Sequence, residues 1–80
     1  MSRKVIEFDK TKRILAFVAT CVEATARTLN ISYKEVFKRM MSLGLIDNYI
    51  YPNYEVLHSE SRENIVKDLI ECMQEWEGRA

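Results

Sequence analysis

The sequence predicts a small all-α domain, and three features of the chain support this prediction. Apolar side chains recur at i, i+3/i+4 and i+7 in two long stretches, which is the pattern of amphipathic helices. A Ser-x-x-Glu capping box at Ser32 marks the start of a third helix. Gly44 and Gly78 stand where two of the patterns end, as helix-stopping glycines do. Because 80 residues support one hydrophobic core, a single domain is expected over residues 1–80.

The first helix is expected over residues 10–29, with Asp9 as its N-cap. The pattern leaves open whether the preceding residues 1–8 are ordered. The apolar positions of the helix fall on one broad side and are Ile14, Leu15, Phe17, Val18, Cys21, Val22, Thr25 and Leu29.

A middle helix is expected over residues 33–42. The Ser32 hydroxyl can accept a hydrogen bond from the Glu35 amide, and the Glu35 carboxylate can accept one from the Ser32 amide. Gly44 is expected in the left-handed conformation that ends such a helix. The apolar side of this helix comprises Val36, Phe37, Met40, Met41 and Leu43.

A short helical connection is expected over residues 47–57, with Asp47 as its cap. Its first part must end by Tyr51, because the residue before a proline disfavours the α region. Pro52 is then expected at the first position of a further helical turn.

The last helix is expected over about residues 60–76, starting from Ser59 or Ser61 and stopped by Gly78. Its buried side is expected to contain Ile65, Val66, Leu69, Ile70, Met73 and Trp76. The fold class is therefore a three-to-four-helix domain with two longer helices, a middle helix and a short helical connection.

Charge is distributed unevenly along the chain, although the net charge is zero. Residues 1–44 carry nine Lys/Arg against four Asp/Glu, and residues 45–80 carry three against eight. The halves are therefore electrostatic complements at +5 and −5, which indicates attraction within one fold or between two copies of the chain. A basic face for nucleic acid is the other interpretation.

The sequence shows no apolar run long enough to span a bilayer and no signal peptide, so a cytoplasmic protein without a membrane partner is expected. Cys21 and Cys72 are about fifty residues apart in apolar stretches, which favours reduced, buried thiols.

No set of residues in the sequence indicates catalysis, so we expect no enzyme activity and no small-molecule substrate. The single histidine, His58, is not accompanied by a nucleophile elbow or an oxyanion site. The ligand spacings of zinc and calcium sites and the glycine-rich phosphate loops are missing too, so no metal and no cofactor are expected. His58 is expected to bond a local backbone group, with its ring against Tyr54 or Leu57.

The hypothesis that best fits the remaining features is a protein-interaction module that binds a protein partner or itself. Its candidate contacts are Tyr49, Tyr51, Tyr54, His58 and Arg62, since aromatic and arginine side chains dominate interface energetics. The tyrosines fit a lid on a small core equally well. Arg62 stands in the first turn of a helix, where the dipole disfavours a cation, so a carboxylate partner such as Glu55 or one on another chain is expected.

The alternative hypothesis is a helix-turn-helix-like DNA-binding regulator. Residues 32–44 followed by Leu45 and Ile46 are similar to such segments, and Lys34, Lys38 and Arg39 give the helix a basic side. No second basic helix and no wing hairpin follow, and the whole domain has no basic excess, so nucleic-acid binding is the weaker hypothesis.

Several runs of residues between Arg13 and Ile70 resemble a bacterial family of short all-helical proteins of unknown function. The most specific run is Tyr54-x-Val56-Leu57-His58 before the acidic last helix, and the others are Phe17-Val18, Cys21-Val22-Glu23, Ile31-Ser32-x-x-Glu35-Val36-Phe37, Gly44-Leu45-Ile46 and Arg62-Glu63-x-Ile65-Val66-x-Asp68-Leu69. Genes of that family often lie beside genes for proteins similar to ADP-ribosyltransferases. The resemblance thus implies an accessory or antitoxin-like partner of a toxin-like protein. Tyr54, Leu57 and His58 match the family pattern, whereas Ser59-Glu60-Ser61 stand in place of a Thr-Gln-Gly-like segment.

Overall fold

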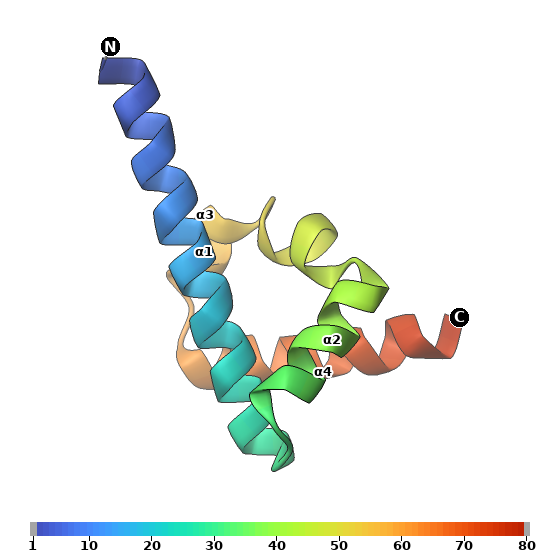
Figure 1. The fold of residues 1–80 in the computed structure, drawn as a ribbon. Coiled ribbons are helices and arrows are strands. Elements are labelled where there is room, and N and C mark those ends of the chain that lie inside the picture. Colours follow the sequence, from blue (N-terminus) through green and yellow to red (C-terminus); the bar gives the residue numbers. More distant parts are fainter. Residues whose placement is uncertain (1, 80) are drawn as a thin grey trace.

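The computed structural model describes the backbone of residues 2–79 and the side chains of residues 9–78. The described residues form five helices and no strand, which confirms the all-α prediction (Figure 1). The helices are α1 (Ser2–Leu29), α2 (Tyr33–Leu43), the π-helix η1 (Ile46–Ile50), α3 (Tyr54–Leu57) and α4 (Arg62–Arg79).

Helix α1 begins at Ser2, so the prediction that Asp9 caps a helix starting at residue 10 is wrong. Ser2–Leu29 contains no glycine or proline that would stop a helix, and an aspartate in an exposed helix interior is only mildly unfavourable. At about 1.5 Å per residue the helix is about 42 Å long, which accounts for the 44 Å long dimension of the molecule. Its N-terminal turns extend beyond the other helices (Figure 1).

The turn between α1 and α2 is built on Asn30, which adopts a left-handed conformation with φ of 59°. The Ile31 amide donates to the Ala26 carbonyl at 3.1 Å, and the Asn30 amide donates to Arg27 at 3.2 Å. This pattern is a Schellman-type helix end, for which asparagine is suited after glycine. It bends the chain by 116° between α1 and α2, so the two helices diverge from this turn in a V (Figure 1).

Helix α2 has the predicted cap residues at both ends, although the capping box contains one hydrogen bond and not the predicted two. The Ser32 hydroxyl accepts a hydrogen bond from the Glu35 amide at 3.1 Å. Gly44 has φ of 69°, and its amide donates to the carbonyls of Met40 and Met41. Gly44 thus ends α2 and directs Leu45 into the core, where it is fully buried.

The connection is helical as predicted, but its boundaries differ. The π-helix η1 starts at Ile46, so Asp47 lies within it and is not its cap. Pro52 lies in the turn after η1, and α3 starts two residues later at Tyr54 with Asn53 at its N-cap position. The Asn53 side-chain amide donates to the Tyr49 carbonyl at 2.7 Å, which ties the turn to η1.

Helix α4 starts from Ser61, whose hydroxyl accepts a hydrogen bond from the Asn64 amide at 3.2 Å. The prediction that Gly78 stops the helix is wrong, because α4 continues through it to Arg79. A glycine in a helix interior only weakens the helix, and a stop needs the left-handed conformation that Gly44 has and Gly78 lacks.

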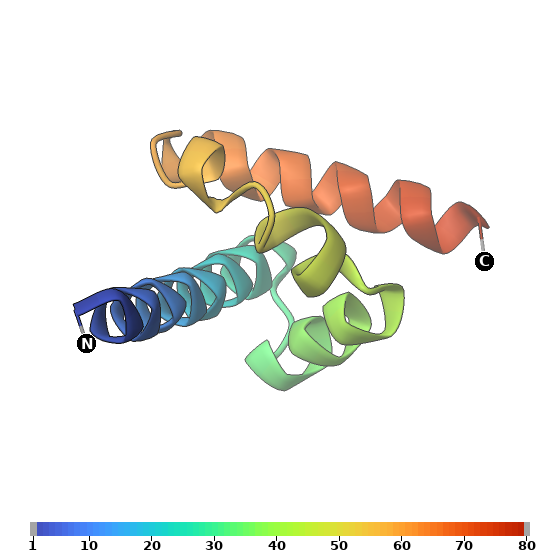
Figure 2. The same cartoon turned by 90° about the horizontal axis from the view of Figure 1, so that it is seen from above.

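The hydrophobic core lies where α1, α2 and α4 pack against one another, with η1 and α3 closing one side (Figure 2). Its fully buried side chains include Val22, Val36, Met40, Leu45, Ile50, Leu69 and Met73. Three side chains assigned to the apolar sides of the helices are instead exposed: Leu15 at 56%, Phe37 at 37% and Met41 at 54%. The apolar arcs of α1 and α2 are therefore wider than the surface that their neighbours cover.

Two ion pairs between described side chains join the basic and the acidic half of the chain. Arg39 Nε and Nη2 donate to Glu77 Oε2 and Oε1 at 2.8 and 2.9 Å, and Lys10 Nζ lies 3.6 Å from Glu55 Oε2. The complementary halves therefore attract each other within one chain.

The Arg39–Glu77 pair predicts a pH-dependent contribution to stability. The hydrogen bond from Arg39 lowers the pKa of Glu77 below its ordinary value, so the pair stabilises the fold above that value and loses its effect as pH falls through the folded-state pKa. We expect Glu77→Gln to lower the free energy of unfolding by less than about 1 kcal/mol at neutral pH. Urea denaturation at several pH values measures the difference, which should shrink below about pH 4. Glu71→Gln is the control, and a deficit in Glu77→Gln that persists in acid would contradict the assignment.

Among the described residues, no single helix is both long and apolar enough to cross a bilayer. One pair of helical segments is long and apolar enough only when the two are counted together, across a bend of 116°: Asp9–Leu29 and Tyr33–Leu43.

Candidate protein-interaction surfaces

Tyr54 is held in an aromatic cluster between Phe17 of α1 and His58 at the end of α3. Its ring contacts Phe17 edge-on with centroids 5.4 Å apart, and it stacks on His58 with centroids 4.7 Å apart and planes 19° from parallel. Aromatic pairs in these geometries contribute about 0.5–1.5 kcal/mol beyond burial. Tyr54 thus serves first to hold α3 against α1.

The structural role predicted for His58 is confirmed. His58 Nδ1 lies 3.1 Å from the Tyr54 carbonyl and 3.0 Å from the Glu55 carbonyl. Carbonyl oxygens only accept hydrogen bonds, so Nδ1 carries a proton that it donates to them. The ring of His58 is thus fixed at the C-terminal end of α3 by its own backbone and by the Tyr54 ring.

The five predicted contact residues do not form one surface. Tyr54 and His58 line a hollow of about 260 Å³ together with Asp9, Lys10, Arg13 and Glu55. Tyr49 is half-buried against the core, and burial together with the nearby Asp68 carboxylate raises the pKa of its hydroxyl. Tyr51 is exposed, and Arg62 lies in a separate groove. The structure therefore supports the lid interpretation for Tyr49 and Tyr54.

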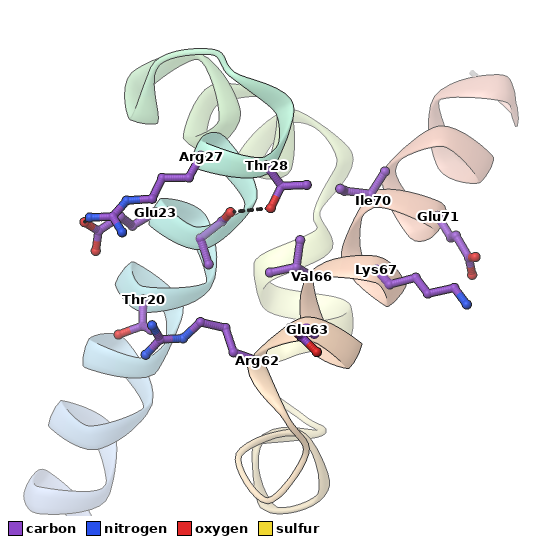
Figure 3. Close-up of a pocket in the computed structure, with 11 residues that line it drawn as sticks. Thr20, Glu23, Arg27, Thr28, Arg62, Glu63, Val66, Lys67, Ile70 and Glu71 are labelled. Carbon is purple, nitrogen blue, oxygen red and sulfur yellow. Dashed lines mark hydrogen bonds and ion pairs between the residues drawn. The ribbon is translucent and has the colours of Figure 1, made fainter.

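The expectation that Glu55 pairs with Arg62 is wrong, because Glu55 pairs with Lys10. Arg62 has no ion-pair partner among the side chains of residues 9–78. The close-up in Figure 3 shows its side chain extending from the start of α4 toward α1, near Thr20.

Burial raises the pKa of the Cys21 thiol to about 11, although the Arg62 guanidinium has a smaller effect that lowers it. The Cys21 thiol is therefore protonated at neutral pH and is not an activated nucleophile.

A groove of about 930 Å³ lies between α1 and α4. Its α1 side contains Thr20, Ala24 and Thr28, which recur every fourth residue and therefore share one face of the helix. Val66 and Ile70 of α4 project into the space between the two helices in Figure 3. The groove thus contains an apolar strip formed by Ala24, Val66 and Ile70, and the α1 side chains at its centre are small.

The charged side chains around the groove are balanced in sign. Acidic groups come from Glu23, Glu63 and Glu71, and basic groups come from Arg27, Arg62 and Lys67. Arg27 pairs with Glu23 one turn earlier on α1, at 3.2 Å. The hydroxyls of Thr20 and Thr28 donate to the carbonyls of Ala16 and Ala24, both at 3.1 Å, so they are satisfied within α1. Arg62 is thus a cation of the groove that lies at the helix end disfavouring a positive charge, and it makes no ion pair with a side chain of residues 9–78.

The basic side predicted for the α2 helix is only partly available. Lys34 and Lys38 are exposed, whereas Arg39 makes the two-bond contact with Glu77. Beside the lysines lie three exposed apolar side chains, Tyr33, Phe37 and Met41. Residues 33–41 therefore present an apolar row next to a basic row. The sequence did not predict this combination, because Phe37 and Met41 were expected on the buried side of the helix.

Metal-ligating side chains are dispersed in the described part of the chain. No group of three or more His, Cys, Asp or Glu residues at positions 9–78 lies close enough together to hold a metal ion.

Comparison with known proteins gives one match. Neither the curated proteins nor the solved structures contain a significant match to the chain. A family model, described as "Protein of unknown function (DUF3791)", matches residues 16–76, from the first helix to the end of the core-facing part of α4. Since the match covers most of the chain, the protein belongs to this family, the DUF3791 proteins of unknown function.

Proposed function

We propose that the protein is a non-enzymatic, cytoplasmic interaction module that binds a helical segment of a partner protein in the groove between α1 and α4. The observation that carries this proposal is Arg62, a cation without an acid partner among residues 9–78, directed across the groove from the first turn of α4. A carboxylate on the bound segment supplies the partner that Arg62 lacks, and charge-assisted hydrogen bonds of this kind are among the stronger ones.

The shape and charge of the groove favour a protein segment over other ligands. Its apolar strip of Ala24, Val66 and Ile70 between two helices suits the helix-in-groove mode of recognition, in which an amphipathic helix inserts its apolar side chains. Its rim carries both signs of charge in equal number, so it provides no positive surface of the kind that nucleic acids require. A segment with both acidic and basic side chains complements such a rim.

The more specific part of the proposal is an accessory or antitoxin-like role, in which binding holds a toxin-like partner inactive. What supports it is the resemblance of the run from Tyr54 to His58 to a family whose genes often lie beside those of ADP-ribosyltransferase-like proteins. In this role Tyr54 and His58 hold α3 against α1, and the groove makes the contact.

A pair of matched substitutions tests the groove. We expect Ala24→Arg to abolish partner binding, because Ala24 lines the groove and the arginine side chain fills it. Ala19→Arg is the control, since Ala19 is exposed on the same helix and does not line the groove. Arginine is a good helix former, so both variants should fold. Affinity purification from the native host followed by mass spectrometry identifies the proteins that are lost from Ala24→Arg alone.

Two outcomes would overturn the proposal. Recovery of the native chain without any stable partner under several growth conditions counts against an interaction module. If both variants recover the same partner, the protein does bind a partner, but the binding site is not the groove.

A further inference from the structure

The outer face of α2 carries a second unexplained feature, an apolar row that no described element covers. Tyr33, Phe37 and Met41 stand at i, i+4 and i+8, and their exposed fractions are 44%, 37% and 54%. The rings of Tyr33 and Phe37 stack with centroids 6.2 Å apart and planes 13° from parallel. We call these three residues the α2 row. None of them lines the groove between α1 and α4.

The position of the α2 row on its helix follows from helical geometry. Val36 and Met40, on one side of it, are fully buried. Lys34 and Lys38 each follow a row residue by one position, which places them about 100° further around the helix, on the side away from the core. Both lysines are exposed, and neither has an ion-pair partner among residues 9–78. The surface is thus an apolar row bordered on its open side by two unpaired cations.

We propose that the α2 row binds an amphipathic helix of a partner protein whose apolar side chains are flanked by Asp or Glu. The row spans about 12 Å, since eight residues separate Tyr33 from Met41 at about 1.5 Å each. A partner helix covers that length with apolar side chains at i, i+3/i+4 and i+7. Its acidic flank lies beside Lys34 and Lys38, and this charge complementarity selects it over helices with basic flanks.

A second copy of the chain is a poorer occupant. If the α2 rows of two copies packed against each other, Lys34 and Lys38 of both copies would lie at the contact without acidic side chains opposite them, and their charges would repel. The exposed acids of α4, such as Glu63, Asp68 and Glu71, do not compensate, because none of the large apolar side chains exposed among residues 9–78 belongs to α4. The acidic helix α4 therefore does not present, within residues 62–78, the amphipathic face that the α2 row fits.

DNA is a poorer occupant as well. Arg39, the third cation of this helix, is held by Glu77 through two hydrogen bonds. The two remaining lysines border apolar side chains, whereas duplex binding draws on many phosphate contacts.

The test is a selection from a displayed library of 18-residue helical peptides, each with leucine fixed on one face and Glu, Gln or Lys at the flanking positions. The full chain is the bait. We expect it to enrich peptides with Glu flanks, and we expect the Lys34→Glu/Lys38→Glu variant to enrich peptides with Lys flanks instead. Lys12→Glu/Arg13→Glu, which changes the net charge equally at exposed sites of α1 outside both α2 and the groove, should keep the preference of the native chain.

A second measurement checks the apolar part of the site. A peptide enriched by the native chain is synthesised, and its binding is followed by fluorescence anisotropy. Met41→Gln keeps a helix-forming side chain of similar length and should weaken binding about tenfold, the effect of removing one interface anchor. Ala24→Arg, which blocks the separate groove, should bind this peptide normally.

The proposal is overturned if no peptide is enriched, if the enriched flanks are basic or neutral, or if the preference does not reverse in the Lys34→Glu/Lys38→Glu variant. It is also overturned if sedimentation shows a dimer that Met41→Gln dissociates, because the occupant is then a second copy. Binding to mixed-sequence duplex DNA that the lysine substitutions abolish would assign the face to nucleic acid.

Discussion

Replacing Leu69 by alanine is expected to lower the free energy of unfolding by about 2–5 kcal/mol, which is a large part of the stability of a domain of this size. Leu69 is fully buried at 0% exposure, in the part of α4 that packs against both α1 and α2. The substitution removes apolar contacts and leaves a cavity that three rigid helices cannot easily fill, so both effects destabilise the fold.

Chemical denaturation followed by far-ultraviolet circular dichroism measures this loss. Leu15→Ala is the matched control, because it makes the same chemical change at a site that is 56% exposed. That variant should stay within about 0.5 kcal/mol of the native chain, as surface substitutions usually do. Equal losses for the two variants would show that α4 does not pack in the core as described.

The same substitution at the two glycines is expected to have opposite effects. Gly44→Ala should destabilise the protein by about 1–2 kcal/mol, because φ of 69° is unfavourable for a residue with a Cβ atom. An added Cβ would also lie 2.8 Å from Asn48 Nδ2. Gly78→Ala should instead stabilise it by up to about 1 kcal/mol, since Gly78 lies inside α4 and alanine is the better helix former. No atom lies within 4 Å of a Cβ at that position.

Thermal unfolding of the two variants under identical conditions tests this difference in sign. A shift of the midpoint temperature downward for Gly44→Ala and upward for Gly78→Ala is the predicted result. A stabilising Gly44→Ala substitution would mean that α2 does not end in the left-handed conformation.

The features that the sequence predicted well are those set by a few neighbouring residues. Ser32 and Glu35 form a local hydrogen bond that needs no other part of the chain. Gly44 adopts the left-handed conformation at the end of its own helix, where its amide bonds to the carbonyls of Met40 and Met41. His58 bonds to carbonyls three and four residues before it, so its role could also be read from its position.

The features that the sequence did not predict depend on neighbours far away in the chain. The extent of α1 before Asp9 could not be inferred, because a helix without an internal breaker continues until something stops it. Burial of Phe37 and Met41 was expected from their apolar character, whereas their exposure depends on how little of α2 the other helices cover. The π-helix η1 has no simple sequence signal either.

The groove was missed for a similar reason. It arises where the small side chains of Thr20, Ala24 and Thr28 meet α4, and only the crossing of the two helices brings them opposite Val66 and Ile70. Arg62 was singled out from its unfavourable place in the helix dipole, and the structure places it in the lining of the groove. Its expected partner Glu55 was wrong because α3 places Glu55 beside Lys10.

The most direct test of the account is an NMR titration of the isotope-labelled chain with the partner recovered by affinity purification. If the partner binds in the groove, the largest changes in backbone amide shifts fall on residues 20–28 of α1 and 62–71 of α4, the two sides of the groove. Changes concentrated on Tyr49–His58, with both sides of the groove unaffected, would contradict it.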